Sequence, residues 1–210
     1  MRLVLISDTH GMEVELPNGD VLVHAGDLTM AGSIPEMAKA LAWLGRERPR
    51  YKRVILIAGN HDFVAESDPV LMDLMCKDHD LTYLSDSGHV FEGVKFWGSP
   101  VQPWFCDWAF NRKRGEDIKR HWNLIPDDTD VLITHGPPAG CLGMTDGGDD
   151  AGCVDLTVAV TRVEPQVHVF GHIHEAYGMK TKPYIKTKFY NASIMNLAYL
   201  PRNRPFVVDL

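Results

Sequence analysis

Five short, mainly apolar segments, each followed within two residues by Asp, Asn or His, constrain the fold of this chain more than any other feature. The segments cover residues 2–6, 20–25, 53–58, 130–134 and 166–170. Their nearly continuous apolar character is typical of strands buried on both faces of a sheet. In α/β sheets ligands bind beyond the carboxyl ends of the strands, so we expect these five strand ends to converge on one site.

Other segments predict helices and further strands around this set. Residues 33–47 have helical apolar spacing, and Ser33 with Glu36 forms a capping-box pattern at the start. Shorter helices are predicted over 70–76 and 154–163, and strands over 81–83, 89–91, 94–97, 184–191 and 206–210. Residues 98–115 and 136–153 are long irregular stretches, which in a domain of this size are often functional.

Length and composition exclude several classes of protein. A chain of 210 residues predicts one domain, 1–210, and the 45% hydrophobic content excludes a mainly disordered chain. The net charge of −7 argues against a nucleic acid duplex as partner. No stretch reaches the ~20 apolar residues of a membrane span, and no signal-peptide pattern is present, so we expect a cytoplasmic protein without a membrane partner. The four cysteines form no CxxC pair and are expected to be free thiols.

The residue types at the strand ends predict a metal centre. Carboxylates, imidazoles and one amide, without a thiolate, suit Mn²⁺ best, with Fe or Zn as alternatives. Seven ligands are too many for one tetrahedral ion and fit a pair of divalent ions, a known device for phosphoryl transfer. The candidate ligands are Asp8, His10, Asp27, Asn60, His135, His172 and His174.

The ordered set of motifs resembles that of the calcineurin-like metallophosphoesterases. The motifs are Asp8-x-His10, Gly26-Asp27, Gly59-Asn60-His61-Asp62, His135-Gly136 and Gly171-His172-x-His174. The resemblance implies an α/β fold, a four-layer α/β/β/α sandwich with the active site at the carboxyl ends of the strands. It implies that Asp8, His10 and His174 bind one ion, that Asn60, His135 and His172 bind the other, and that Asp27 bridges the two.

The same resemblance assigns catalytic roles. A metal-bridging hydroxide would attack phosphorus in line, His61 would serve the leaving group, and Asp62 would orient His61. Further segments, among them Gly98–Phe105 and Trp108–Asn111, look like the brain-type metallophosphoesterase-domain subfamily and its bacterial relatives. That subfamily is similar to phosphodiesterases of small diesters, including cyclic nucleotides. A small phosphodiester or nucleotide is therefore the expected substrate, with Asn60 and Trp104 as candidate contacts.

Several alternatives remain open from the sequence. The enzyme can instead be a phosphomonoesterase or protein phosphatase, the chain can be a metal-binding scaffold without catalysis, and a homodimer is one option for its assembly. His24 and His168 are expected in supporting or core roles, and His79, His89 and His121 on the surface. The aromatic residues of the 98–115 stretch either plug one end of the sandwich or line the cleft, and Trp104 is our choice as the ring that stacks on substrate.

Overall fold

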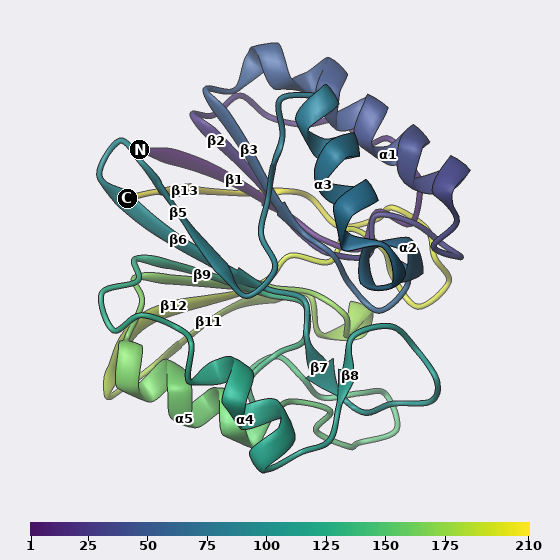
Figure 1. The fold of residues 1–210 in the computed structure, drawn as a ribbon. Helices are drawn as coiled ribbons and strands as arrows, with labels where there is room; N and C mark the ends of the chain where they lie inside the picture. Colours follow the sequence, from purple (N-terminus) through teal and green to yellow (C-terminus); the bar gives the residue numbers. More distant parts are fainter.

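Two β-sheets pack face to face in the computed structural model, which describes residues 1–210 (Figure 1). The first sheet has the order β13-β1-β2-β3-β4 and the second β11-β12-β10-β9-β6-β5. The first contains β1 (Arg2–Ile6), β2 (Val21–Ala25), β3 (Arg53–Ile57), β4 (Thr82–Tyr83) and β13 (Phe206–Asp209). The second contains β5 (Ser87–Phe91), β6 (Val94–Ser99), β9 (Val131–Thr134), β10 (Val167–Phe170), β11 (Gly178–Lys182) and β12 (Ile185–Asn191). A separate pair joins β7 (Gln102–Pro103) to β8 (Asn111–Arg112).

Helices cover both outer faces of this pair of sheets (Figure 1). α1 (Ile34–Glu47) and α3 (Pro69–Asp78) lie on the first sheet, with the short α2 (Phe63–Ser67) beside them. α4 (Glu116–Trp122) and α5 (Val154–Val163) lie on the second. Single 3₁₀ turns occur at Arg48–Arg50 and His174–Ala176. The predicted capping box is present, because the Ser33 hydroxyl accepts from the Glu36 N–H while the Glu36 carboxylate accepts from the Ser33 N–H.

Three hydrophobic clusters fill the three spaces between the four layers. Val4 and Ile6 of β1 pack toward α1, whereas Leu3 and Leu5 pack between the sheets. A third cluster, which includes Trp122, fills the space between the second sheet and its helices. Alternation along β1 thus buries both of its faces, as its continuous apolar sequence predicts. The predicted α/β/β/α sandwich is confirmed.

Parallel pairing brings the carboxyl ends of the five diagnostic strands together. β1, β2 and β3 are parallel neighbours in the first sheet, and β9 and β10 are parallel neighbours in the second. A bridge between Ser7 and Ser193 joins the residue after β1 to the segment after β12, so the two sheets are connected at this end. The loops that carry the predicted site therefore share one edge of the sandwich.

The sequence missed several peripheral elements. α4 buries only Ile118 and Trp122, so its apolar pattern is too sparse to stand out. β11 is an edge strand with mainly exposed residues, paired antiparallel with β12. Residues 98–115 are less irregular than expected, since they contain the parallel pair β7–β8. None of the helices is long and apolar enough to cross a membrane.

Candidate metal centre

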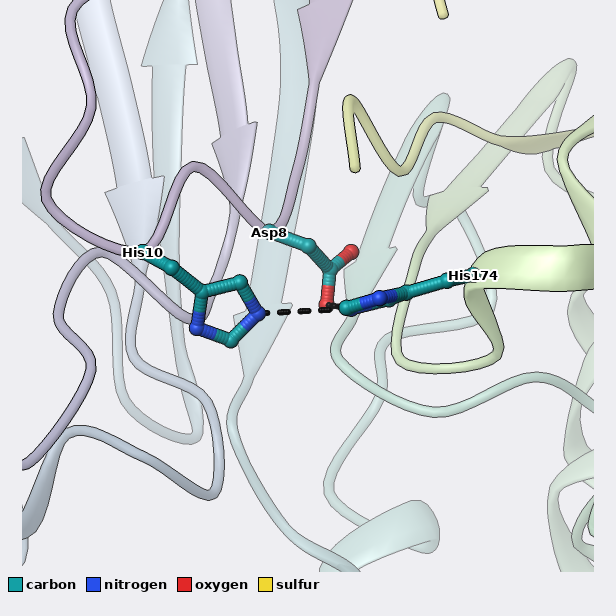
Figure 2. A group of neighbouring side chains, drawn as sticks. All are labelled: Asp8, His10 and His174. Carbon is teal, nitrogen blue, oxygen red and sulfur yellow. Dashed lines mark hydrogen bonds and ion pairs between the residues drawn. The ribbon is translucent and has the colours of Figure 1, made fainter. Parts of the chain in front are cut away.

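Asp8, His10 and His174 form one group of candidate ligands, drawn from both halves of the chain (Figure 2). Asp8 and His10 follow β1, and His174 opens the 3₁₀ turn after β10. The Nε2 atoms of the two imidazoles lie 3.3 Å apart, and His174 Nε2 lies 3.5 Å from Asp8 Oδ1. All three residues are buried, and the Asp8 carboxylate comes down between the two rings (Figure 2).

A second group lies beside the first and contains Asp27, His135 and His172. His135 Nε2 lies 2.9 Å from the Asn60 side-chain oxygen and 3.4 Å from Asp27 Oδ2. Asp27 Oδ2 is also 3.8 Å from His10 Nε2, so this carboxylate lies between the two groups. A third group, His10, Asp27 and His61, overlaps the first two. The structure thus brings all seven candidate ligands together, with Asp27 between the Asp8 group and the His135 group.

Backbone carbonyls fix the orientation of four histidines around the site. A carbonyl oxygen can only accept a hydrogen bond, so each Nδ1 carries a proton and each neutral ring presents an unprotonated Nε2 to the cleft. The pairs are His10 with Thr29 O at 3.1 Å, His61 with Met30 O at 2.6 Å, His135 with Ala25 O at 3.0 Å and His174 with Asn196 O at 3.2 Å.

With neutral rings, the Nε2 atoms in this arrangement would meet other lone pairs. His10 Nε2 lies 3.3 Å from His174 Nε2, and His135 Nε2 faces two oxygen atoms. Such contacts are favourable only when a proton or a metal cation lies among them. Histidines anchored through the other ring nitrogen are also the usual arrangement of metal ligands. The donor set therefore fits divalent metal ions.

The electrostatics of the group agree with that fit. Burial opposes ionisation of Asp8, but its hydrogen bond with His174 and the charge of that ring hold the Asp8 pKa well below its usual range. Burial likewise opposes ionisation of Asp27, but His135 lowers the Asp27 pKa to about 2. Burial favours neutral His135, yet the charge of Asp27 and its hydrogen bond raise the His135 pKa to about 9. In the metal-free protein a proton on His135 thus supplies part of the positive charge that the carboxylates require.

Four of the seven candidate ligands have a strained backbone. Asp8, His10, Asp27 and His172 all have positive φ, between 46° and 68°. Left-handed conformations cost non-glycine residues about 1–2 kcal/mol each, and such strain persists mainly at functional sites. Position 171 requires glycine, because a Cβ atom there would lie 1.9 Å from Asp8 Oδ2. This close approach lets the His172 N–H donate to both Asp8 oxygens at 3.1 Å.

The structure corrects the role predicted for Asp62. Its carboxylate does not contact the His61 ring, which is oriented by the Met30 carbonyl at 2.6 Å. Asp62 instead accepts from Gly59 N, Leu28 N and the Thr29 N–H and hydroxyl. It ties the loop after β3 to the loop after β2, and so positions His61 only through the backbone. Burial, with a contribution from the Asp27 charge, raises the Asp62 pKa to about 6.

Two other buried histidines support the ligand loops. His24 Nε2, in β2, lies 2.9 Å from the hydroxyl of Thr9, the residue between the candidate ligands Asp8 and His10. His168 Nε2, in β10, lies 2.9 Å from the hydroxyl of Thr134, the residue before His135. Burial lowers the pKa of His24 to about 4 and that of His168 to about 3, so both rings are neutral. His121, predicted on the surface, is instead largely buried and pairs with Asp86 at 2.7 Å.

A cavity of about 360 Å³ opens beside the ligand groups. Asn60, His61, Arg114 and His172 line it, together with a set of large rings: Trp104, Phe105, Trp108 and Tyr199. Trp108 packs against His61 with ring centroids 4.2 Å apart. The Trp104 N–H donates to the Arg112 carbonyl, which extends the β7–β8 pairing and holds this segment at the cavity.

The aromatic residues of the 98–115 stretch divide between the two predicted roles. Phe110 is only 5% exposed and packs in the cluster beneath α1, as a plug would. Trp104 is 56% exposed and Phe105 is 60% exposed, so neither plugs the sandwich. Tyr199 was missed from the sequence, since it follows no strand-end motif. The cysteines are free, as predicted, and only Cys106 is exposed.

A four-layer sandwich with adjoining groups of His and Asp side chains at its strand ends is the arrangement of a metallophosphoesterase. Comparison with known families agrees, because the profile of the calcineurin-like phosphoesterases matches residues 1–176. The chain belongs to this family.

Relatives cover the whole chain. It is 40% identical to metallophosphoesterase domain-containing protein 1 of Homo sapiens and of Mus musculus, over 100% of this chain and 71% of each relative. Among solved structures, TT1561 of Thermus thermophilus is similar with a TM-score of 0.60 at 12% identity, covering 99% of this chain and 98% of that one. Another structure reaches a TM-score of 0.70 with the same identity and coverage. These two similarities concern the fold.

Proposed function

We propose that the chain is a metal-dependent phosphodiesterase that cleaves small diesters with an aromatic or nucleoside group, cyclic nucleotides among them. The observation that carries the proposal is the set of four imidazoles whose Nδ1–H groups are held by backbone carbonyls. Their Nε2 atoms point at two buried carboxylates beside an aromatic cavity.

The residues of the chain would have separate roles in such a reaction. A pair of divalent ions held by the seven ligands would supply positive charge to the phosphoryl oxygens and activate water. His61, whose Nε2 lies 4.0 Å from Asp27 Oδ2, is placed to give a proton to the departing oxygen. The Met30 carbonyl holds the His61 ring in the tautomer with the proton on Nδ1, so the proton delivered at Nε2 must first be taken up there.

The cavity favours a diester over a monoester. Among its lining residues Arg114 is the only Lys or Arg, and its guanidinium already donates to the Gly152 and Ala151 carbonyls. A dianionic monoester or a phosphopeptide would gain little electrostatic stabilisation from a cavity with this single, already hydrogen-bonded cation. The aromatic rings offer an organic group stacking contacts worth about 1–3 kcal/mol each. Trp104 and Asn60 remain our candidate substrate contacts.

The remaining properties of the proposed enzyme follow from the donor set and the charge. We place Mn²⁺ first among the metals, with Fe or Zn next, because all seven ligands offer oxygen or nitrogen. A net charge of −7 supports a small substrate rather than a nucleic acid duplex. The proposal places the enzyme in the cytoplasm without a membrane partner, and includes a homodimer as one option for its assembly.

Hydrolysis of bis-p-nitrophenyl phosphate against p-nitrophenyl phosphate, each with Mn²⁺ and after treatment with a chelator, tests the proposal. We expect the diester to be the better substrate and the chelator to abolish turnover. Preference for the monoester would make the protein a phosphomonoesterase, and turnover of neither would support a metal-binding scaffold.

Trp104→Ala tests the aromatic wall, with Tyr184→Ala as control because Tyr184 is 94% exposed and outside the cavity. The Trp104 variant should raise KM for cyclic nucleotides more than for a small alkyl diester, at an unchanged melting temperature. A large loss of stability with unchanged selectivity would contradict the assignment.

A further inference from the structure

Tyr199 lies in the metal site although it is outside the segment that the family profile matches, residues 1–176. Its ring packs edge-on against two candidate ligands, with centroids 4.9 Å from His10 and 5.1 Å from His174. It also faces His61, at 6.5 Å, and lines the cavity. A residue from the end of the chain thus completes a wall beside both the Asp8 group and the proposed proton donor.

A strained turn holds Tyr199 in this place. Its φ is +54°, a conformation that is uncommon for a bulky side chain and unfavourable for any residue with a Cβ. The Asn196 side chain accepts the N–H groups of Ala198 and Leu200, both at 3.0 Å, and the Asn196 carbonyl accepts that of Tyr199 at 2.9 Å. The same carbonyl anchors the His174 ring. One turn therefore presents the tyrosine and orients a ligand.

The Tyr199 hydroxyl has no hydrogen-bond partner in the chain. In contrast, the hydroxyl of Tyr177, in the neighbouring loop, donates to the Arg204 carbonyl at 2.9 Å. Tyr199 is 41% exposed and lines the cavity, so a ligand bound there can reach its side chain. If the ring served for packing alone, phenylalanine would do the same without presenting a polar group to the site.

We infer that Tyr199 contacts the substrate of the proposed phosphodiesterase. Its hydroxyl donates a hydrogen bond to an oxygen of the bound phosphodiester, and its ring forms a wall of the subsite for the leaving group. Trp108, which packs on His61, forms another wall of that subsite. The inference rests on the proposed function for the identity of the ligand, and on the ring contacts, the turn and the free hydroxyl for the role of the residue.

The test is Tyr199→Phe, which removes the hydroxyl and keeps the ring. With the Mn²⁺-loaded protein and bis-p-nitrophenyl phosphate, kcat/KM should fall about 10- to 100-fold, the usual effect of losing a hydrogen bond to a charged group. Metal content and melting temperature should not change, and Tyr184→Phe should behave as the unmodified protein. Tyr199→Leu should show a further rise in KM that is larger for aryl diesters than for small alkyl diesters.

Two results would overturn the inference. Unchanged kcat and KM in Tyr199→Phe would show that the hydroxyl contacts no substrate. Loss of bound Mn²⁺ in that variant would show that the residue supports the ligands instead.

Failure of the proposed function is a separate result. If the unmodified protein cleaves no diester, calorimetric titration of the Mn²⁺-loaded protein with inorganic phosphate still examines the contact. Weaker phosphate binding by Tyr199→Phe, by about tenfold or more, would support the role of Tyr199, and equal affinity would refute it.

Discussion

Replacement of Gly171 by alanine should disable the metal centre through one added carbon atom. The new Cβ would lie 1.9 Å from Asp8 Oδ2 and 2.3 Å from the Ser7 hydroxyl oxygen. Real Cβ atoms essentially never approach other heavy atoms closer than 3.0 Å, so the carboxylate or the backbone must shift by about 1.1 Å, which is 3.0 − 1.9. The φ of Gly171 is not in the left-handed region, so the clash is the main effect of the substitution.

A shift of this size has three measurable consequences. Misplacement by about 1 Å can cost about 10²-fold in turnover, and disturbed ligand support typically costs about 10- to 100-fold in metal affinity. Overpacking of a buried site costs about 1–3 kcal/mol of stability. For a chain of this size each kcal/mol corresponds to about 2–4 °C in melting temperature, so we expect a decrease of about 2–12 °C.

Gly136→Ala is the matched control. Gly136 directly follows the ligand His135, but a Cβ there would meet nothing nearer than the Gln102 side chain at 3.8 Å. Metal titrations and melting curves should therefore separate the two variants. Equal behaviour of Gly171→Ala and Gly136→Ala, or a Gly171→Ala protein with full metal affinity, would refute the close-approach account.

The other predictions concern the ligands and the residues that hold them. Asp27→Ala should lower occupancy at both metal positions, because Asp27 lies between the two groups; two full equivalents of metal in that variant would contradict a bridging role. His61→Ala should keep the metals and lose about 10²–10⁴-fold in turnover, less for a p-nitrophenolate leaving group; equal losses for good and poor leaving groups would exclude an acid role. Since the metal-free pKa of His135 is raised to about 9, metal binding must release its proton. The apparent affinity for the metal should therefore rise by up to about tenfold per pH unit below pH 9 and level off above it. A metal affinity that does not change from about pH 6 to 8 would argue against this linkage. His24→Ala should weaken metal binding about 10- to 100-fold, while His24→Gln should restore part of it, because an amide N–H₂ can still donate to Thr9; equal losses in both variants would refute a positioning role.

The sequence predicted that the candidate ligands would lie together because their positions obey a local rule. Each candidate ligand follows a buried strand within a few residues, and parallel pairing then brings the strand ends together. The same rule does not reach contacts that depend on loop geometry. Asp62 follows His61 directly, yet the Met30 carbonyl orients that ring, from a loop 31 residues earlier in the chain.

Tyr199 shows a second limit of prediction from sequence. It enters the site through a turn held by Asn196, and neither residue belongs to a strand-end motif. One signal was available: an asparagine followed by a turn shortly after the closing strand β12. That signal predicts the turn and says nothing of where the ring points, because the bridge between Ser7 and Ser193 is what brings this segment to the metal ligands.

Both sheets use a His–Thr hydrogen bond to hold their ligand loops, and in the second sheet this arrangement costs stability. The Thr134 hydroxyl donates to the Gly136 carbonyl at 2.8 Å, so its single proton is taken and His168 Nε2 must donate to Thr134. His168 Nδ1 then carries a bare lone pair, buried without a partner. An unsatisfied buried group costs about 1–3 kcal/mol, which an apolar side chain in this strand would avoid. In β2, His24 Nδ1 accepts the Gly26 N–H at 3.3 Å, so His24 Nε2 likewise donates to Thr9. A polar side chain that a purely structural core would exclude thus holds each ligand loop, which indicates that ligand placement, rather than stability, determines these two strand positions.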